Sequence, residues 1–239
     1  MIDRLRFASL AGLATILMVG CSSTVTMEMP TIPQPRMEKI PVDVAVRMPA
    51  EFEDFVHVEE VLGKETWTIK LGRSNAAFFT QLFGHMFDSV VVLGPDDDPR
   101  DFQFDALIEP VIDGFEFSTP SQSQSEAFAV WIRYRMSIFD SVGNRASSWT
   151  VNAYGKSQKE GLGGGDSLER AAILAMRDAA ALIIMQMEKV TNIRELADGP
   201  LDPADVDPSV MQAGVEQQDE EPASVIGIFA IGGIDDAAE

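Results

Sequence analysis

The sequence has almost no cysteine, since Cys21 is the only one in 239 residues. One thiol cannot form a disulfide within the chain, so the folded part must be held together by packing alone. Histidine is nearly as scarce, because His57 and His85 are the only two. A zinc site would need carboxylates to complete its set of ligands. We therefore expect a disulfide-free body with no metal site and no cofactor.

Basic residues are few beside acidic ones: 18 Lys and Arg against 38 Asp and Glu give a formal net charge of −20. Binding to nucleic acid requires clustered Lys and Arg, which displace the counterions of the phosphates. The acidic excess is uneven, because residues 195–239 hold twelve acidic side chains and no basic one. We expect no nucleic-acid partner, and we treat the acidic end of the chain as separate from the folded body.

The apolar run at residues 7–20 is too short for a membrane-spanning helix. It holds 14 residues, whereas a helix needs about 20 apolar residues to cross a bilayer core. Arg4 and Arg6 precede the run, which is the arrangement of a secretory signal peptide. An uncut anchor helix is the alternative, and the length of the run disfavours it. We predict that residues 1–20 are a signal peptide.

The end of this segment, Met18-Val19-Gly20-Cys21, resembles the lipobox of bacterial lipoproteins. Met18 stands where that family usually has leucine. The resemblance implies cleavage between Gly20 and Cys21 and a cysteine that carries fatty acyl chains such as palmitate. Two or three such chains hold a protein firmly on a membrane. Ser22, where an aspartate would mark retention in the inner membrane, implies the periplasmic face of the outer membrane.

Composition divides the remaining chain into three parts. Residues 21–38 are rich in Thr, Pro and Met, which predicts an extended tether that lifts the body off the lipid. Residues 39–192 carry apolar periodicity and are long enough for one periplasmic domain with its own core. Residues 193–239 are rich in Asp, Pro, Gly and Glu and predict a disordered acidic tail. Its apolar island, residues 225–234, is either unstructured or a motif that docks on a partner by strand addition.

Periodicity within the domain predicts an α+β fold. Alternating apolar residues indicate half-buried strands, and apolar residues at helical spacing indicate helices. We predict one antiparallel sheet of about four to five strands packed by two helices, in the order β-β-α-β-β-β-β-α. Pro110 predicts a bulge or an edge in its strand. The predicted strands are about 40–48, 66–71, 88–93, 104–117, 128–139 and 147–156, and the predicted helices are 74–87 and 167–189.

Glycines 161 and 163–165 precede the second helix, whose start is marked by Asp166 and Glu169 in the spacing of a capping box. A glycine-rich loop before a helix could in principle hold phosphate. The Walker lysine and the G-x-G-x-x-G pattern are both missing from the sequence at this point. We therefore interpret the loop as a flexible connection.

No combination of residues points to catalysis, and we expect no enzymatic activity. The sequence lacks the G-x-S-x-G element that would hold a nucleophilic serine. The acidic run at residues 96–98 has the wrong spacing for an EF-hand and is interpreted as a solvated loop. Asp105, Glu109 and Asp113 share one predicted strand, but carboxylates on a solvent-facing strand are ordinary.

The layout resembles that of small α+β outer-membrane lipoproteins that assist envelope machines, over roughly residues 39–190. The residues behind this resemblance are strand 128–139 with its turn 140–144, and helix 167–187 with the segments 169–172 and 177–180. Similar layouts occur in LptE-like and YajG-like lipoproteins, in LpoB-like activators of penicillin-binding proteins, and in auxiliary lipoproteins of ABC transport systems. The resemblance implies a non-enzymatic accessory or assembly factor for transport, secretion, or wall or outer-membrane biogenesis.

The strand at 128–139 has two faces that differ in chemistry. Its apolar face should meet the core, whereas Trp131, Arg133 and Arg135 should meet solvent or a partner. We expect these three residues to bind a protein of the cell envelope. The alternative is a periplasmic lipid- or glycan-binding module, in which the Phe-rich helix and the sheet form the walls of a cleft.

Overall fold

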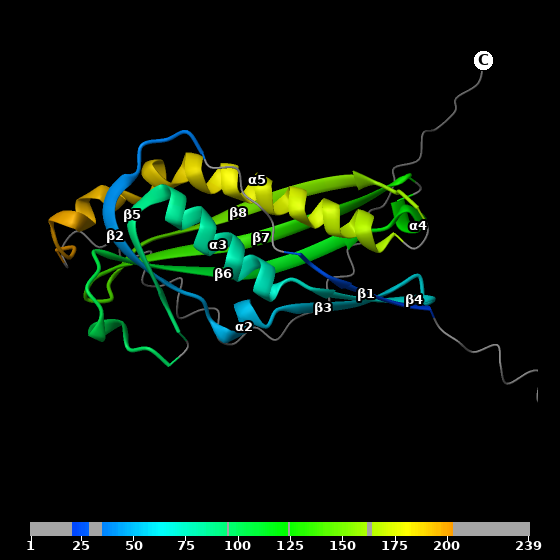
Figure 1. Cartoon of the computed structure of the whole chain (residues 1–239), viewed down its shortest axis with the longest axis horizontal. Helices are drawn as coiled ribbons and strands as arrows, with labels where there is room; N and C mark the ends of the chain where they lie inside the picture. Colours follow the sequence, from blue (N-terminus) through cyan, green and yellow to red (C-terminus); the bar gives the residue numbers. More distant parts are fainter. Residues whose placement is uncertain (1–20, 29–34, 95, 124, 162–163, 203–239) are drawn as a thin grey trace, which may run out of the picture. The chain divides into compact units, whose positions relative to one another are not determined.

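The computed structural model describes residues 21–28, 35–94, 96–123, 125–161 and 164–202 (Figure 1). Within these residues no helix is both long and apolar enough to cross a membrane. The predicted signal peptide and residues 203–239 of the predicted tail lie outside them. The strands are β1 (Cys21–Thr26), β2 (Ile40–Arg47), β3 (Val56–Val61), β4 (Glu65–Lys70), β5 (Phe87–Leu93), β6 (Ala106–Ser118), β7 (Ala127–Asp140) and β8 (Arg145–Gln158). The α-helices are α2 (Ala50–Glu53), α3 (Gly72–Met86), α4 (Pro120–Ser123) and α5 (Gly165–Thr191), and the 3-10 helices are η2 (Pro99–Asp101) and η3 (Ile193–Asp198).

The larger sheet has five strands in the order β5-β2-β6-β7-β8. The meander β6-β7-β8 is antiparallel, as predicted, but β2 runs parallel to both β5 and β6. The prediction of an antiparallel sheet therefore holds for β6, β7 and β8 but not for β2, because the long crossover through α3 returns the chain in the direction of β2. The expected irregularity is present: β6 pairs with β2 only as far as Ile108, and its register shifts between Ile112 and Gly114.

Two helices, α3 and α5, cover one face of this sheet, which we call the inner face (Figure 1). This confirms the α+β class. The phenol of Tyr134 on β7 is fully buried and donates a hydrogen bond to Asn75 Oδ1 on α3 (2.5 Å). Burial raises the pKa of Tyr134, because the phenolate would lose its hydration. The helix is thus joined to the sheet by a polar contact as well as by apolar packing.

A second sheet, in the order β1-β4-β3, was not predicted. Residues 21–26 fall within the predicted tether but form β1, which pairs in parallel with β4. Val25 and Met27 are buried, and the carbonyl of Met27 accepts a hydrogen bond from Ser74 Oγ (2.7 Å). The tether prediction was therefore wrong for these residues, because short alternation beside a proline-rich stretch carries little signal in the sequence.

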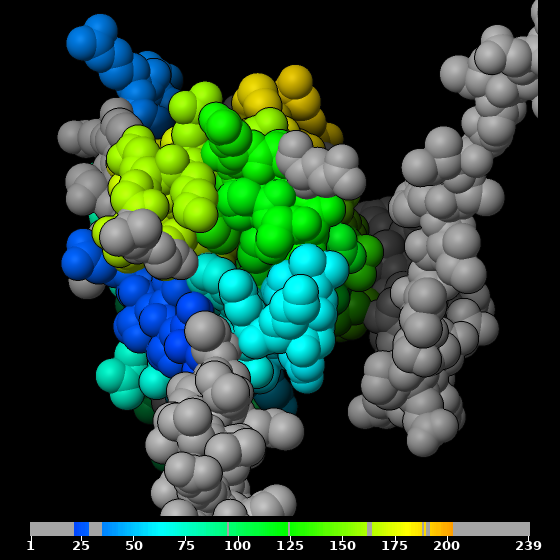
Figure 2. Space-filling model, turned by 90° about the vertical axis from the view of Figure 1, so that its right-hand side faces the viewer, coloured from blue at the N-terminus to red at the C-terminus, as the bar shows by residue number. Residues whose placement is uncertain are grey.

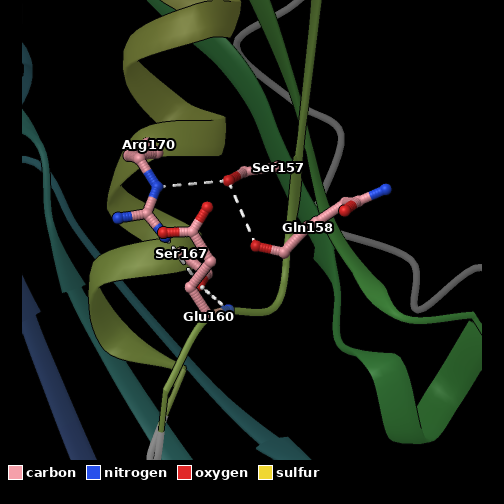
Figure 3. A network of polar contacts seen from close by, with 5 residues as sticks. All are labelled: Ser157, Gln158, Glu160, Ser167 and Arg170. Carbon is pink, nitrogen blue, oxygen red and sulfur yellow. Dashed lines mark hydrogen bonds and ion pairs between the residues drawn. The ribbon is translucent and has the colours of Figure 1, made fainter.

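The start of α5 is held by a network of side chains rather than by the predicted capping box (Figure 3). Gly164, at a φ of 77°, is the cap, and Asp166 lies inside the first turn. Ser167 Oγ accepts the N–H of Glu160 (3.0 Å) and a hydrogen bond from Arg170 Nη2 (3.1 Å). Arg170 also forms an ion pair with Glu160 (3.1 Å). Glu160, just after β8, is therefore held against the first turns of α5.

The body extends beyond its predicted end at residue 192. Ile193 and Leu196 of η3 are buried in the main core. The N–H of Leu201 donates to Asp140 Oδ2 (3.1 Å), and Asp140 also accepts the N–H of Asn144 (2.7 Å). Apolar residues at 193 and 196 belong to the domain because they pack on its core, although the surrounding composition is acidic.

Candidate functional site

The outer face of the larger sheet, opposite α3 and α5, carries the predicted partner-binding residues. Trp131 and Arg133 are exposed and Arg135 is half-buried, so alternation along β7 placed all three correctly. Trp131 lies across from Tyr154 on β8, and the two ring centroids are 5.1 Å apart. Each of these aromatic residues is 43% exposed. The pair forms an exposed apolar platform that spans β7 and β8.

A bulge in β6 positions the two arginines beside this platform. Asp113 is the residue without a partner at the register shift, and its carboxylate forms an ion pair with Arg135 Nη2 (3.2 Å). Arg133 Nη2 donates to the carbonyl of Asp113 (3.4 Å). A Cβ added to Gly114 would lie 3.4 Å from Arg133 Nη2, so this guanidinium lies directly beside the glycine. The bulge thus supplies a carboxylate for one arginine and a carbonyl for the other.

These side chains surround a shallow hollow of about 230 Å³. Drug-sized ligands are usually buried in pockets of roughly 300–1,000 Å³. A hollow of this size therefore suits one side chain or one sugar ring better than an enclosed ligand. Its lining is amphipathic, with two aromatic residues, both charge signs and an amide: Gly114, Glu116, Trp131, Arg133, Asn152 and Tyr154, together with Ile132 and Ala153.

The other end of the outer face is covered by its own chain. Ala45, Leu93 and Leu107 form a small buried cluster, and Phe102 and Phe104 pack against it from the segment before β6. A wide hollow of about 900 Å³ borders this segment and the β7–β8 turn. Arg47, which lines that hollow, forms an ion pair with Glu109. The apolar side chains at this end are thus covered by the protein itself, unlike those of the Trp131–Tyr154 platform.

Three of the acidic residues considered as catalytic or calcium-binding candidates accept hydrogen bonds from the backbone. Asp105 Oδ2 accepts the N–H of Asp43 (2.9 Å). Asp97 Oδ2 accepts the N–H of Gly94 (2.7 Å), and Asp98 Oδ1 accepts the N–H of Arg100 (3.0 Å). Carboxylates that accept backbone N–H groups in this way stabilise turns and strand starts.

The histidines lie on different elements, His57 on β3 and His85 in the last turn of α3. His57 Nε2 is 3.1 Å from Glu59 Oε2, and its ring centroid is 5.0 Å from that of Phe115. Among the residues that the structure describes, no three His, Cys, Asp or Glu side chains come together in a way that could hold a metal ion.

Sequence reasoning missed the residues that β8 and β6 bring to the site. Tyr154 and Asn152 are exposed members of an alternating strand, and Gly114 follows the bulge. Alternation could have placed the first two on a solvent face. Only the register of β7 with β8 could have placed Tyr154 beside Trp131.

Comparison with protein-family models and with curated proteins finds no match. Among solved structures, the chain is similar to a Xanthomonas campestris protein of the DUF330 family, at 12% identity and a TM-score of 0.44, over 70% of this chain and 97% of that one. It is also similar to a minor lipoprotein from Acinetobacter baumannii, at 12% identity and a TM-score of 0.38, over 64% and 97%. A hypothetical protein from Chlamydia trachomatis matches at 10% identity and a TM-score of 0.37, over 61% and 95%.

At such identities and scores, these similarities assign no family, partner or activity to this chain. The particular resemblance to LptE-like, YajG-like and LpoB-like lipoproteins stays a prediction.

Proposed function

We propose that this chain is a lipid-anchored, non-enzymatic accessory protein of the bacterial envelope that binds a protein partner through the outer face of its larger sheet. The observation that supports this most is the Trp131–Tyr154 platform beside Arg133. Exposed aromatic residues next to arginine are the usual anchors of protein interfaces. The outer-membrane location and the role in envelope transport or assembly belong to the same proposal.

The anchor would be made at Cys21. Its thiol displaces the headgroup phosphate of a phospholipid: a C–S bond to the glycerol carbon forms, the C–O bond to phosphate breaks, and the thiol proton leaves with the headgroup. Water then cleaves the peptide bond between Gly20 and Cys21. The support is the lipobox-like sequence after a charged start and a 14-residue apolar run.

The anchor is tested by expressing the full chain in a bacterium and separating its membranes. The parent protein should appear in the membrane fraction with the mass of the chain from Cys21 plus its acyl groups. Cys21→Ser should be uncut and carry no lipid. A parent chain whose mass includes no acyl group contradicts this part of the proposal.

The partner surface is tested by photo-crosslinking in intact cells. A photoreactive amino acid replaces Asn152, which lines the hollow. The matched control position is Leu174, which is 41% exposed on α5. We expect a crosslinked product from position 152 that Trp131→Ala reduces by roughly 30-fold, the effect of a central interface residue worth about 2 kcal/mol. Equal products from both positions, or products insensitive to Trp131→Ala, contradict the proposal.

A glycan is the second candidate ligand, favoured by the composition of the same hollow. Sugar rings could stack on Trp131 and Tyr154 while Glu116 and Asn152 form hydrogen bonds to their hydroxyls. The originally expected cleft walls do not serve this function, because the phenylalanines of α3 are buried in the core. Retention of the protein on immobilised envelope glycans, lost on Trp131→Ala, would favour this candidate over a protein partner.

A further inference from the structure

The turn between β3 and β4, residues 62–64, lies at the end of the smaller sheet where β1 begins. Cys21 pairs with Glu65 in the parallel register, and Glu65 pairs with Val61 across the hairpin. The chain therefore enters β1 and β4 from the same side. Two strand spacings separate Cys21 from Val61, or about 10 Å. Figure 2 views this end, with β1 in blue beside the cyan of β3 and β4.

Leu62 in this turn is a residue that the fold itself does not explain. It is 60% exposed and has a φ of 53°, and Gly63 follows with a φ of 62°. Lys64 donates its N–H to the carbonyl of Val61 (3.1 Å), which closes the turn. Turns with two positive φ angles favour Asn-Gly, and a bulky residue in this region is strained. A leucine here costs stability and leaves most of its side chain exposed.

The position of Cys21 indicates which surface the Leu62 side chain contacts. If Cys21 carries the lipid, no spacer separates the acyl groups from the first residue of β1. The polar layer on each side of a bilayer core is only about 5–8 Å thick. Because the turn folds back between Val61 and Glu65, its tip projects beyond Glu65 by the rise of only one to two residues, roughly 3–6 Å, which is enough for Leu62 to reach into that layer. Glu60 and Glu65 more than offset the positive charge of Lys64. The attraction between this turn and the membrane would therefore come from the apolar side chain of Leu62.

We propose that the β3–β4 turn contacts the bilayer that holds the lipid of Cys21, with Leu62 inserted among the headgroups. The smaller sheet is then the membrane-facing end of the protein, and the body rests on the surface instead of standing off on a tether. This inference depends on the lipidation of Cys21 proposed above, but not on any partner.

The test uses the acylated protein, which begins at Cys21, in phosphatidylcholine vesicles that contain a lipid with a spin-labelled headgroup. Because Cys21 is the only cysteine and its thiol is then blocked, Lys64→Cys gives one site for a fluorophore. Val142→Cys is the matched control, since Val142 is 68% exposed in the β7–β8 turn. That turn follows the end of β7, whereas Phe128 near its start contacts Trp67 of β4 (5.9 Å between centroids).

The spin label should quench the fluorophore at position 64 several times more strongly than the one at position 142. Leu62→Asn, added to the Lys64→Cys chain, should lower this quenching while keeping the fold, because asparagine tolerates a positive φ. Equal, weak quenching at both positions in protein that floats with the vesicles overturns the inference and leaves the anchor standing. Quenching that Leu62→Asn does not change overturns the role of Leu62. Protein that carries no lipid and does not float overturns both proposals.

Discussion

The two faces of β7 are built from alternate residues of one strand but serve different purposes. On the inner face, Val130, Ile132, Tyr134, Met136 and Ile138 are all exposed by 1% or less. On the outer face, Trp131 is 43% exposed, and its ring lies beside that of Tyr154 (5.1 Å between centroids). The inner set should therefore determine stability and the outer set should determine contacts. Substitutions on the two faces should separate these properties.

The largest loss of stability is expected at Phe79, which faces the inner side of β7 from α3. Its ring is fully buried, with centroids 5.5 Å from Phe52 and 5.3 Å from Tyr134. Phe79→Ala should lower the free energy of unfolding by about 3–5 kcal/mol, because it leaves a cavity in a packed core. Urea denaturation measures this, with Val142→Ala as the exposed control. A loss below about 1 kcal/mol would show that this core is not tightly packed.

The stability of the protein should be nearly as sensitive to substitution of Gly155 on β8. A Cβ added to Gly155 would lie 2.0 Å from the carbonyl oxygen of Ala171, in the backbone of α5. Gly155→Ala should therefore cost about 3 kcal/mol, the upper end for overpacking, because a whole helix must move. Gly84→Ala is the matched control, since nothing lies within 4 Å of its added Cβ. That change should stabilise the protein by about 0.5–1 kcal/mol, because alanine favours α3. Equal effects of the two changes would contradict the close approach of α5.

These contrasts also indicate what the sequence could predict. The meander and α5 have long, regular apolar patterns, so their existence and type were predicted from periodicity. The parallel placement of β2 depends on where the crossover returns the chain. The strands β1 and β3 form because they pair with β4. Such contacts between distant segments cannot be recognised from the apolar periodicity of a six-residue strand. In the site, Trp131 and Arg133 followed from alternation, whereas Tyr154 required the register.

On the inner face of β7, the stability that Tyr134 contributes should depend on pH. Tyr134→Phe should cost about 1–3 kcal/mol at neutral pH, because it leaves the buried Asn75 Oδ1 without its donor. Burial raises the pKa of Tyr134 in the folded protein, whereas an unfolded chain loses that proton near pH 10. Above this pH the folded state binds more protons, so stability that is complete below pH 10 falls as pH rises.

Denaturation of both proteins between pH 8 and pH 11 tests this difference. The parent should lose stability above about pH 10 by up to roughly 1.4 kcal/mol per pH unit from this group, and Tyr134→Phe should lose correspondingly less. Parallel pH profiles would mean that Tyr134 is not buried as a neutral phenol.

The smallest effect on stability is expected on the outer face. Trp131→Ala removes a cross-strand aromatic contact with Tyr154, which is worth about 0.2–1 kcal/mol. A double-mutant cycle with Tyr154→Ala isolates this contact, because each single change leaves the hydrogen bonds of β7 and β8 in place. A coupling within this range, together with loss of the crosslink at position 152, would assign the tryptophan to contact with a partner. A coupling of several kcal/mol would instead make the platform part of the folded core, and the two faces of β7 would no longer differ in purpose.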